Sequence, residues 1–253
     1  MSKTLLYVEN LSVSFDGFKA LDLELFELDR GELRVIIGPN GAGKSTFMDV
    51  ICGKTKPDTG RIMMDNRDLT KLSEKRIVET GVGRKFQNPN VFGSLTVYDN
   101  LMLAYRTNKS VFKTLFYRED QAARDTIMST LETVGLVDER ERESQYLSHG
   151  QKQWLEIAMV IVQDPTLLLI DEPAAGMTDE ETYKTGELLT RLKQNHTIIV
   201  IEHDMEFVRQ IANVVTVLAE GKMLTQGPMA EVQNDPRVIE TYLGAALDEE
   251  PAA

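Results

Sequence analysis

The sequence predicts an α/β fold: a mixed, mainly parallel sheet with an antiparallel β part at the N-terminus and an inserted α-helical subdomain. Two observations predict it. At both ends of the chain, short aliphatic runs that suit strands buried on both faces alternate with amphipathic helical segments. From about Leu95 to Arg142 these aliphatic runs stop and helical spacing replaces them. The layout is therefore an α/β core with a helical insertion near its middle.

The elements of the first half follow from alternation, turn residues and helix-ending signals. Strands are expected where apolar and β-branched residues alternate or run together, and a helix where the run ends at Gly53. In order, these elements are the strands 5–15, 18–29 and 32–37, the helix 45–52 and the strand 61–65.

The elements of the second half repeat a helix–strand pattern. After Gly150, Trp154, Ile157 and Ile161 recur at helical spacing, which indicates an amphipathic helix. The other expected elements are the helices 118–134, 179–195 and 205–213 and the strands 166–170, 197–201 and 214–219. We expect an α/β core at 1–87 and 164–245, a helical subdomain at 88–163 and an acidic tail at 246–253.

Composition limits the classes of function. The 253 residues carry 28 basic and 40 acidic side chains, a net charge of −12 that argues against a nucleic-acid-binding face. The single cysteine, Cys52, cannot form an internal disulfide, which favours a reducing compartment. Apolar runs such as TLLLI are far shorter than the roughly 20 residues that cross a membrane. Any membrane role would therefore require a partner.

A glycine-rich turn separates the strand at 32–37 from the helix at 45–52. It matches G-x-x-x-x-G-K-[ST], the phosphate loop, in full, with the residues Gly38, Pro39, Asn40, Gly41, Ala42, Gly43, Lys44 and Ser45. Backbone N–H groups and a helix N-terminus can surround a phosphate there. We expect Lys44 to contact the β- and γ-phosphates, with Thr46 beside them, and the Ser45 hydroxyl to bind Mg²⁺. Kinases, GTPases and ATPases share this loop.

Two carboxylates follow a second buried run. Asp171 and Glu172 come directly after LLLI, so the end of the strand would place Asp171 at the carboxyl edge of the sheet. There Asp171 would hold Mg²⁺, mainly through water. Glu172 points differently and can polarise an attacking water, a contribution of about 10²–10⁴ in rate. Together with the phosphate loop, the pair predicts nucleotide hydrolysis.

Three further segments resemble the ATP-binding subunits of ABC transporters. Residues 147–151, LSHGQ, resemble the signature motif LSGGQ and precede Asp171 as in that family. Gln87, in GRKFQN, matches the glutamine of the Q-loop, and His203, in IEHD, matches the switch histidine. The resemblance covers essentially the whole chain, and the order of the motifs separates it from GTPases and small-molecule kinases.

The resemblance implies roles in binding and hydrolysing ATP with Mg²⁺. Gln87 would bind Mg²⁺ or orient water, and His203 would contact the γ-phosphate. Phe15 would stack on adenine, with Phe18 as its rival. The signature would face the γ-phosphate held by the opposite subunit, so that two nucleotides lie between two ATPase chains; the residues concerned are Ser148, Gly150 and Gln151.

Two residues depart from the family pattern. His149 replaces a glycine of the signature, where it is either a tolerated side chain or a pH-sensitive contact. Thr178 stands in the D-loop where many relatives carry an aspartate, so communication across the dimer through that carboxylate is in doubt unless Asp179 substitutes for it.

The resemblance also implies partners and a location. The chain would be a peripheral ATPase on the cytoplasmic face of the membrane, paired with a second ABC ATPase as a homodimer or heterodimer. Residues 87–96 would dock two membrane-spanning permease subunits, and an extracytoplasmic solute-binding protein would act indirectly. No nucleic acid is expected.

The solute is suggested only by similarity to one group of importers. Several segments resemble the ATPases of branched-chain amino acid and urea importers, and LSHGQKQWLEI and AGMTDEET look nearest the urea type. We therefore expect a small polar solute, with urea or a short-chain amide first and a branched-chain amino acid next. One alternative is a soluble ABC-type ATPase of DNA repair or translation, which would need basic patches or long insertions. Another is a non-hydrolysing regulatory subunit, against which Glu172 and His203 argue.

Overall fold

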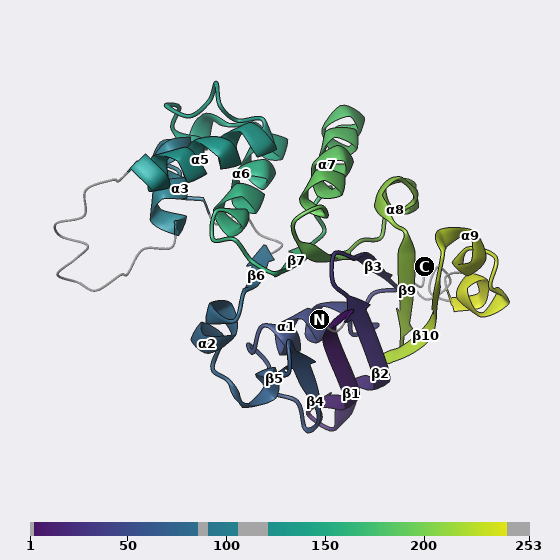
Figure 1. Ribbon diagram of the computed structural model, residues 1–253. Helices are drawn as coiled ribbons and strands as arrows, with labels where there is room; N and C mark the ends of the chain where they lie inside the picture. The colour runs from purple at the N-terminus through teal and green to yellow at the C-terminus, as the bar shows by residue number, and fades with distance from the viewer. Residues whose placement is uncertain (1–2, 86–90, 106–120, 242–253) are drawn as a thin grey trace.

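The computed structural model describes residues 3–85, 91–105 and 121–241. Two β-sheets lie side by side, and a group of helices extends from one end of the larger sheet (Figure 1). Gln87, the whole of the predicted acidic tail and part of the expected docking segment 87–96 lie outside the described residues.

The smaller sheet is antiparallel and contains the N-terminal strands in the order β2-β1-β4-β5. Its strands are β1 (Thr4–Phe15), β2 (Phe18–Asp29), β4 (Thr59–Met64) and β5 (Arg67–Asp68). β1 and β2 form a hairpin in which Phe15 pairs with Phe18. The turn between them contains Asp16 and Gly17, both at positive φ, which is the backbone conformation that tight hairpin turns require.

The larger sheet has the order β10-β9-β3-β8-β7-β6. Its strands are β3 (Leu33–Ile37), β6 (Val82–Lys85), β7 (Leu167–Asp171), β8 (Thr197–Ile201), β9 (Val214–Ala219) and β10 (Lys222–Gly227). All neighbours pair in parallel except β10, which pairs antiparallel with β9. Every residue of β3, β7 and β8 is buried, as their aliphatic sequences predict for strands covered on both faces.

Alternate residues of the parallel strands enter two hydrophobic cores. Leu167, Leu169 and Ile199 pack in the core shared with the antiparallel sheet and α1 (Lys44–Ile51). Leu168 and Ile198 face the other core, which the helices of the second half cover. The result is three layers, with the parallel sheet in the middle, because a parallel sheet must be covered on both faces.

The remaining helices fall into two groups. Around the sheets lie α2 (Glu74–Glu79), α7 (Asp179–Leu192), α8 (Met205–Ile211), α9 (Met229–Val232) and the short 3₁₀ helix Leu69–Lys71. Between β6 and β7 the described chain forms α3 (Val97–Ala104), α5 (Gln121–Val134), the 3₁₀ helix Ser144–Tyr146 and α6 (His149–Ile161), which pack together beyond the end of β6 (Figure 1). Among the described helices, none is both long and apolar enough to cross a membrane.

The predicted fold class is confirmed, with differences at the ends of elements. The helix expected at 179–195 ends at Leu192, and the one expected at 205–213 ends at Ile211. β6 was not predicted, because Arg84 and Lys85 interrupt the aliphatic pattern that marks the other buried strands. Also not predicted were α2, α3, α9, β5 and β10, which are short or half-exposed and give weak periodic signals.

Candidate functional site

Three predicted functional segments meet at one edge of the parallel sheet. The phosphate loop follows β3, Asp171 ends β7, and His203 comes two residues after β8. These strands are neighbours in the order β3-β8-β7 and run in parallel, so their carboxyl ends share an edge. In open α/β sheets, ligands bind outside this edge.

The phosphate loop is shaped by close backbone contacts and by the position of Lys44. Gly38 has φ 153°, and a Cβ there would lie 2.1 Å from the backbone oxygen of Leu218, so only glycine fits. Lys44 Nζ bends back over the loop and donates to the carbonyl oxygens of Gly38 (2.6 Å) and Pro39 (2.9 Å). Burial lowers the pKa of Lys44, while Glu172 and Asp171 oppose this shift. The ammonium group is thereby held within the loop.

These residues fit a nucleotide with Mg²⁺. No side chain caps α1, because its N-cap is Gly43, so its first amides can turn toward an anion. Within the described chain, no cluster of three or more His, Cys, Asp or Glu side chains forms a metal cage. Ser45 and Asp171 would therefore hold the ion together with phosphate oxygens and water, the pattern that Mg²⁺ prefers at nucleotides.

Asp171 lies between two buried cationic side chains that the sequence reasoning missed. Arg84 Nη2 is 3.9 Å from Asp171 Oδ2, and Arg84 also donates from Nη1 to Asp49 on α1. Lys85, on the opposite face of β6, donates to the backbone oxygen of Asp171 at 3.4 Å and lies 3.9 Å from Glu156. Burial raises the pKa of Asp171, while Arg84 and Lys85 act to lower it. The two cations therefore favour the ionised carboxylate that a metal ion needs.

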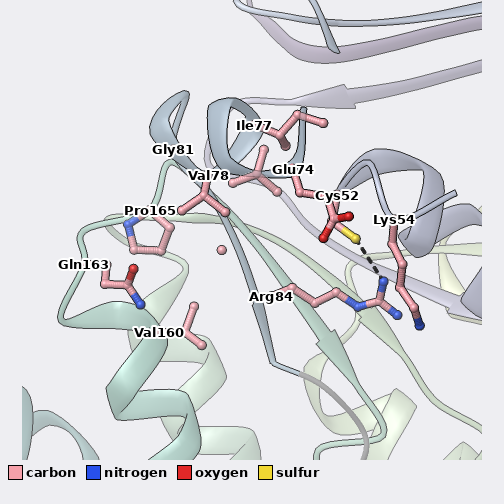
Figure 2. Close-up of a pocket in the computed structure, with 12 residues that line it drawn as sticks. Cys52, Lys54, Glu74, Ile77, Val78, Gly81, Arg84, Val160, Gln163 and Pro165 are labelled. Atoms are coloured by element: carbon pink, nitrogen blue, oxygen red, sulfur yellow. Dashed lines mark hydrogen bonds between the residues drawn. The ribbon is translucent and has the colours of Figure 1, made fainter. Parts of the chain in front are cut away.

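A cavity lies along β6 between Gly81 and Arg84 (Figure 2). It has a volume of about 180 Å³ and lies between α2, β6 and the end of α6, with an apolar wall that includes Ile77 and Pro165. Cys52 lies there half-buried, and its Sγ accepts a hydrogen bond from Arg84 Nη1 at 3.1 Å. None of the described residues that line this cavity belongs to the phosphate loop.

Glu172 and His203 face each other across the sheet edge. His203 Nδ1 is 3.4 Å from Glu172 Oε1, and the histidine side chain is 65% exposed. Glu172 has φ 44°, the left-handed region that a non-glycine residue adopts at a cost of about 1–3 kcal/mol and that is common at functional sites. Its backbone N–H donates to Ile201 at 3.0 Å, which fixes this turn against β8.

Glu202 bonds to the backbone of the two segments that carry Glu172 and His203. Its carboxylate accepts from the backbone N–H of Ala174 (3.2 Å) and of His203 (3.1 Å). The side chain is buried, and this burial raises its pKa. Glu202 thus ties the segment after Glu172 to the segment that carries His203, a role that its place beside a histidine motif did not reveal.

The signature segment begins α6 and contacts the start of α7. Ser148 is the N-cap of α6, where its hydroxyl accepts from the Gln151 N–H while the Gln151 side chain accepts from the Ser148 N–H. His149 Nε2 lies 2.9 Å from the backbone oxygen of Ala175. Thr178 is the N-cap of α7 and forms the same kind of capping box with Glu181. Both departures from the family pattern therefore have local structural roles.

The two aromatic candidates and the docking segment are placed only in part. Phe15 and Phe18 are 49% and 68% exposed at the tip of the same hairpin, so either ring can receive a base. Phe92 is 54% exposed, and Val91 packs partly buried against the core. Trp154 packs partly buried against the core, and its Nε1 donates to Thr185 on α7 at 2.9 Å.

Comparison with protein families gives two matches. The ABC transporter family matches residues 22–175, more than half of the chain, and the branched-chain amino acid ATP-binding cassette transporter family matches residues 222–248.

Individual relatives are similar to this chain over nearly its full length. The chain is 36% identical to the high-affinity branched-chain amino acid transport ATP-binding protein LivG of Escherichia coli (strain K12), covering 97% of this chain and all of that protein. It is 33% identical to BraF of Pseudomonas aeruginosa over the same shares. The ADP-bound crystal structure of MJ1267, an ATP-binding cassette of an ABC transporter, superposes with a TM-score of 0.85 at 30% identity, covering 96% of this chain and all of that one.

Proposed function

The chain belongs to the ABC transporter family as an ATP-binding and ATP-hydrolysing subunit of an importer, and we propose that it powers the uptake of branched-chain amino acids. Relatives named for branched-chain amino acid transport cover 97% of the chain, and a family model of that group matches its C-terminal part. None of these comparisons supports urea, which the sequence placed first. The proposed order is therefore the reverse of the one predicted from the signature and D-loop segments.

The binding half of the mechanism rests on the phosphate loop. Its amides, Lys44 and the hydroxyls of Ser45 and Thr46 would hold the phosphates, and Phe15 would stack on adenine. Asp171 and Ser45, with Gln87, would hold Mg²⁺, which when bound neutralises phosphate charge. Arg84 and Lys85 would favour the ionised form of Asp171, since Arg84 lies beside its carboxylate and Lys85 beside its backbone oxygen, and both act to lower its pKa.

The hydrolytic half rests on one observation, the 3.4 Å approach of His203 Nδ1 to Glu172 Oε1. Glu172 would polarise the attacking water, while the imidazole would orient this carboxylate and contact the γ-phosphate. The left-handed backbone at Glu172 and the Glu202 bonds to both loops hold the two side chains at the same edge. This preorganisation is what positions a general base before the substrate arrives.

ABC ATPase subunits dimerise and work with membrane permeases, and we assign the following arrangement to this chain. Ser148, Gly150 and Gln151 would complete the nucleotide site of a second ATPase chain, since they open a helix whose N-terminus attracts anions. ATP would close this pair and hydrolysis would release it. The exposed Phe92 region would contact two permeases at the cytoplasmic face of the membrane, and an extracytoplasmic binding protein would deliver the solute.

The catalytic assignment is tested by Glu172→Gln. The variant should retain ATP binding, because Lys44 and the loop amides remain, while turnover falls by about 10²–10⁴. Glu79→Gln is the matched control, since it neutralises an exposed carboxylate on α2, away from the sheet edge. Turnover of Glu172→Gln equal to that of the control would disprove the role of Glu172.

The solute is tested by uptake. In cells that lack this chain, uptake of labelled leucine should be lost, restored by the wild-type chain and not by Glu172→Gln. Labelled urea serves as the competing substrate in the same cells. If urea uptake follows the chain and leucine uptake does not, the proposed solute is wrong.

A further inference from the structure

Glu181 joins the N-termini of two helices. Its Oε2 accepts from the backbone N–H of Thr178 at 3.2 Å, as the second half of the capping box of α7. Its Oε1 accepts from the hydroxyl of Ser148, the N-cap of α6, at 3.1 Å. One carboxylate thus lies at the positive ends of both helix dipoles.

The fit of this carboxylate against α6 depends on Gly150. A Cβ at Gly150 would lie 2.5 Å from the carboxyl carbon of Glu181, so any side chain there would displace the acid. The Thr178 N–H and the Ser148 hydroxyl also lower the pKa of Glu181, which keeps it ionised at neutral pH. An internal anion therefore lies directly at the N-terminus of α6.

This arrangement competes with the partner's phosphate. A hydroxyl has one proton to donate, and Ser148 gives it to Glu181. In the proposed function the same hydroxyl and the same helix N-terminus contact the γ-phosphate on the opposite subunit. A phosphate that approaches must take over the Ser148 proton and must also come close to the negative charge of Glu181, which raises the free energy of the closed pair.

We propose that Glu181 is a positioning residue that holds the signature serine in the open state and restrains ATP-driven closure of the dimer. The inference rests on the proposed function of Ser148. When closure draws the Ser148 hydroxyl to the γ-phosphate, Glu181 loses its contact with α6 and keeps only its contact with Thr178. A second contact joins the signature segment to the D-loop, because His149 Nε2 lies 2.9 Å from the backbone oxygen of Ala175. Glu181 therefore couples the signature of one subunit to its own D-loop.

The test is ATP-driven self-association of the full chain. Glu172→Gln is the parent, because it prevents turnover, and sedimentation equilibrium with ATP and Mg²⁺ gives the dimer Kd. Glu181→Gln in this background should lower that Kd about tenfold, since it removes a charge beside the incoming phosphate. The amide oxygen of glutamine can still accept from Thr178, so α7 stays capped.

Glu180→Gln is the matched control. Glu180 is the preceding residue of α7, is exposed and pairs with Lys184, so the change of net charge and of helix position is nearly the same. Its Kd should stay within about twofold of the parent. Equal Kd values for the two variants, or a weaker dimer for Glu181→Gln, would overturn the inference.

Salt separates charge from structure. The difference in dimer Kd between Glu181→Gln and Glu180→Gln should become smaller when the ionic strength rises from about 0.05 to 0.5 M, because salt screens the interaction between exposed charges. A difference in dimer Kd that does not change with salt would refute the electrostatic role of Glu181. A parent that stays monomeric with ATP would instead show that two copies of this chain do not form the proposed sandwich with each other, whatever the Glu181 variants do.

Discussion

Replacing Arg84 by methionine should destabilise the fold by about 3 kcal/mol. The Arg84 side chain is 7% exposed and lies between Asp49 and Asp171, which are 21% and 8% exposed. At 3.9 Å from Asp171 and an effective dielectric constant of about 20, its attraction to that carboxylate alone is about 4 kcal/mol before desolvation is subtracted. Removing one partner of a buried ion pair costs about 3–5 kcal/mol, and the partial exposure of Asp49 places Arg84 at the lower end.

Thermal and urea unfolding measure this loss. For a chain of this size, about 3 kcal/mol corresponds to a fall in Tm of about 6–12 °C. Arg30→Met is the matched control, because Arg30 also pairs with an aspartate, Asp65, but both side chains are exposed (42% and 49%). An exposed pair contributes at most about 1 kcal/mol, so the control should lose no more than about 4 °C.

The comparison has a clear refuting result. If both arginine variants lose the same stability, burial does not decide the strength of the Arg84 pair. If Arg84→Met is more stable than the wild type, the cost of desolvating the charges exceeds their attraction, and the stabilising role assigned to Arg84 is wrong.

The other predictions concern the loop, a surface carboxylate and the packing of α6. Gly38→Ala should abolish binding of a fluorescent ATP analogue, because its Cβ would overlap a backbone oxygen, while Gly31→Ala, with φ 75° and open space, should leave binding intact. Arg237 lowers the pKa of Asp235 from 3.8 to about 2. The contribution of the ionised Asp235 to the free energy of unfolding is therefore present above about pH 4 and lost as pH falls to about 2. The difference in unfolding free energy between wild type and Asp235→Asn, measured in urea, should fall to near zero from about pH 4 to about pH 2. A difference that stays constant over this pH range would contradict the pairing. Trp154→Phe should lower the unfolding free energy by about 1 kcal/mol, and an unchanged urea midpoint would show that the indole hydrogen bond contributes nothing.

The fold could be predicted to the extent that its signals are local. The aliphatic runs that became β3, β7 and β8 are recognisable because strands buried on both faces need apolar side chains at every position. β6 escaped prediction because two of its four residues are the charged Arg84 and Lys85. Their charges are tolerated there only because Asp49, Asp171 and Glu156 lie beside them.

The site divides in the same way. The phosphate loop and the order of the other motifs can be predicted from the sequence, since they depend on residue type and spacing over a few positions. The choice between Phe15 and Phe18 stays open, because both lie exposed on one hairpin. His149 and Thr178 could be read from the sequence only as departures, and their bonds to Ala175 and Glu181 appear only when α6 and α7 are brought together.

The α/β fold, the phosphate loop and the nucleotide chemistry follow from the amino-acid sequence alone, because glycine conformations, buried strands and helix starts are set by neighbouring residues. Which distant charged side chains lie next to each other depends on how the elements pack in the folded chain. Arg84 meets Asp171 across 87 positions, and Ser148 meets Glu181 across 33 positions. These pairs depend on the order of the strands and on the packing of helices from different parts of the chain, which no local pattern records. That packing sets the electrostatics of the site and places an internal anion where a partner's phosphate is proposed to bind.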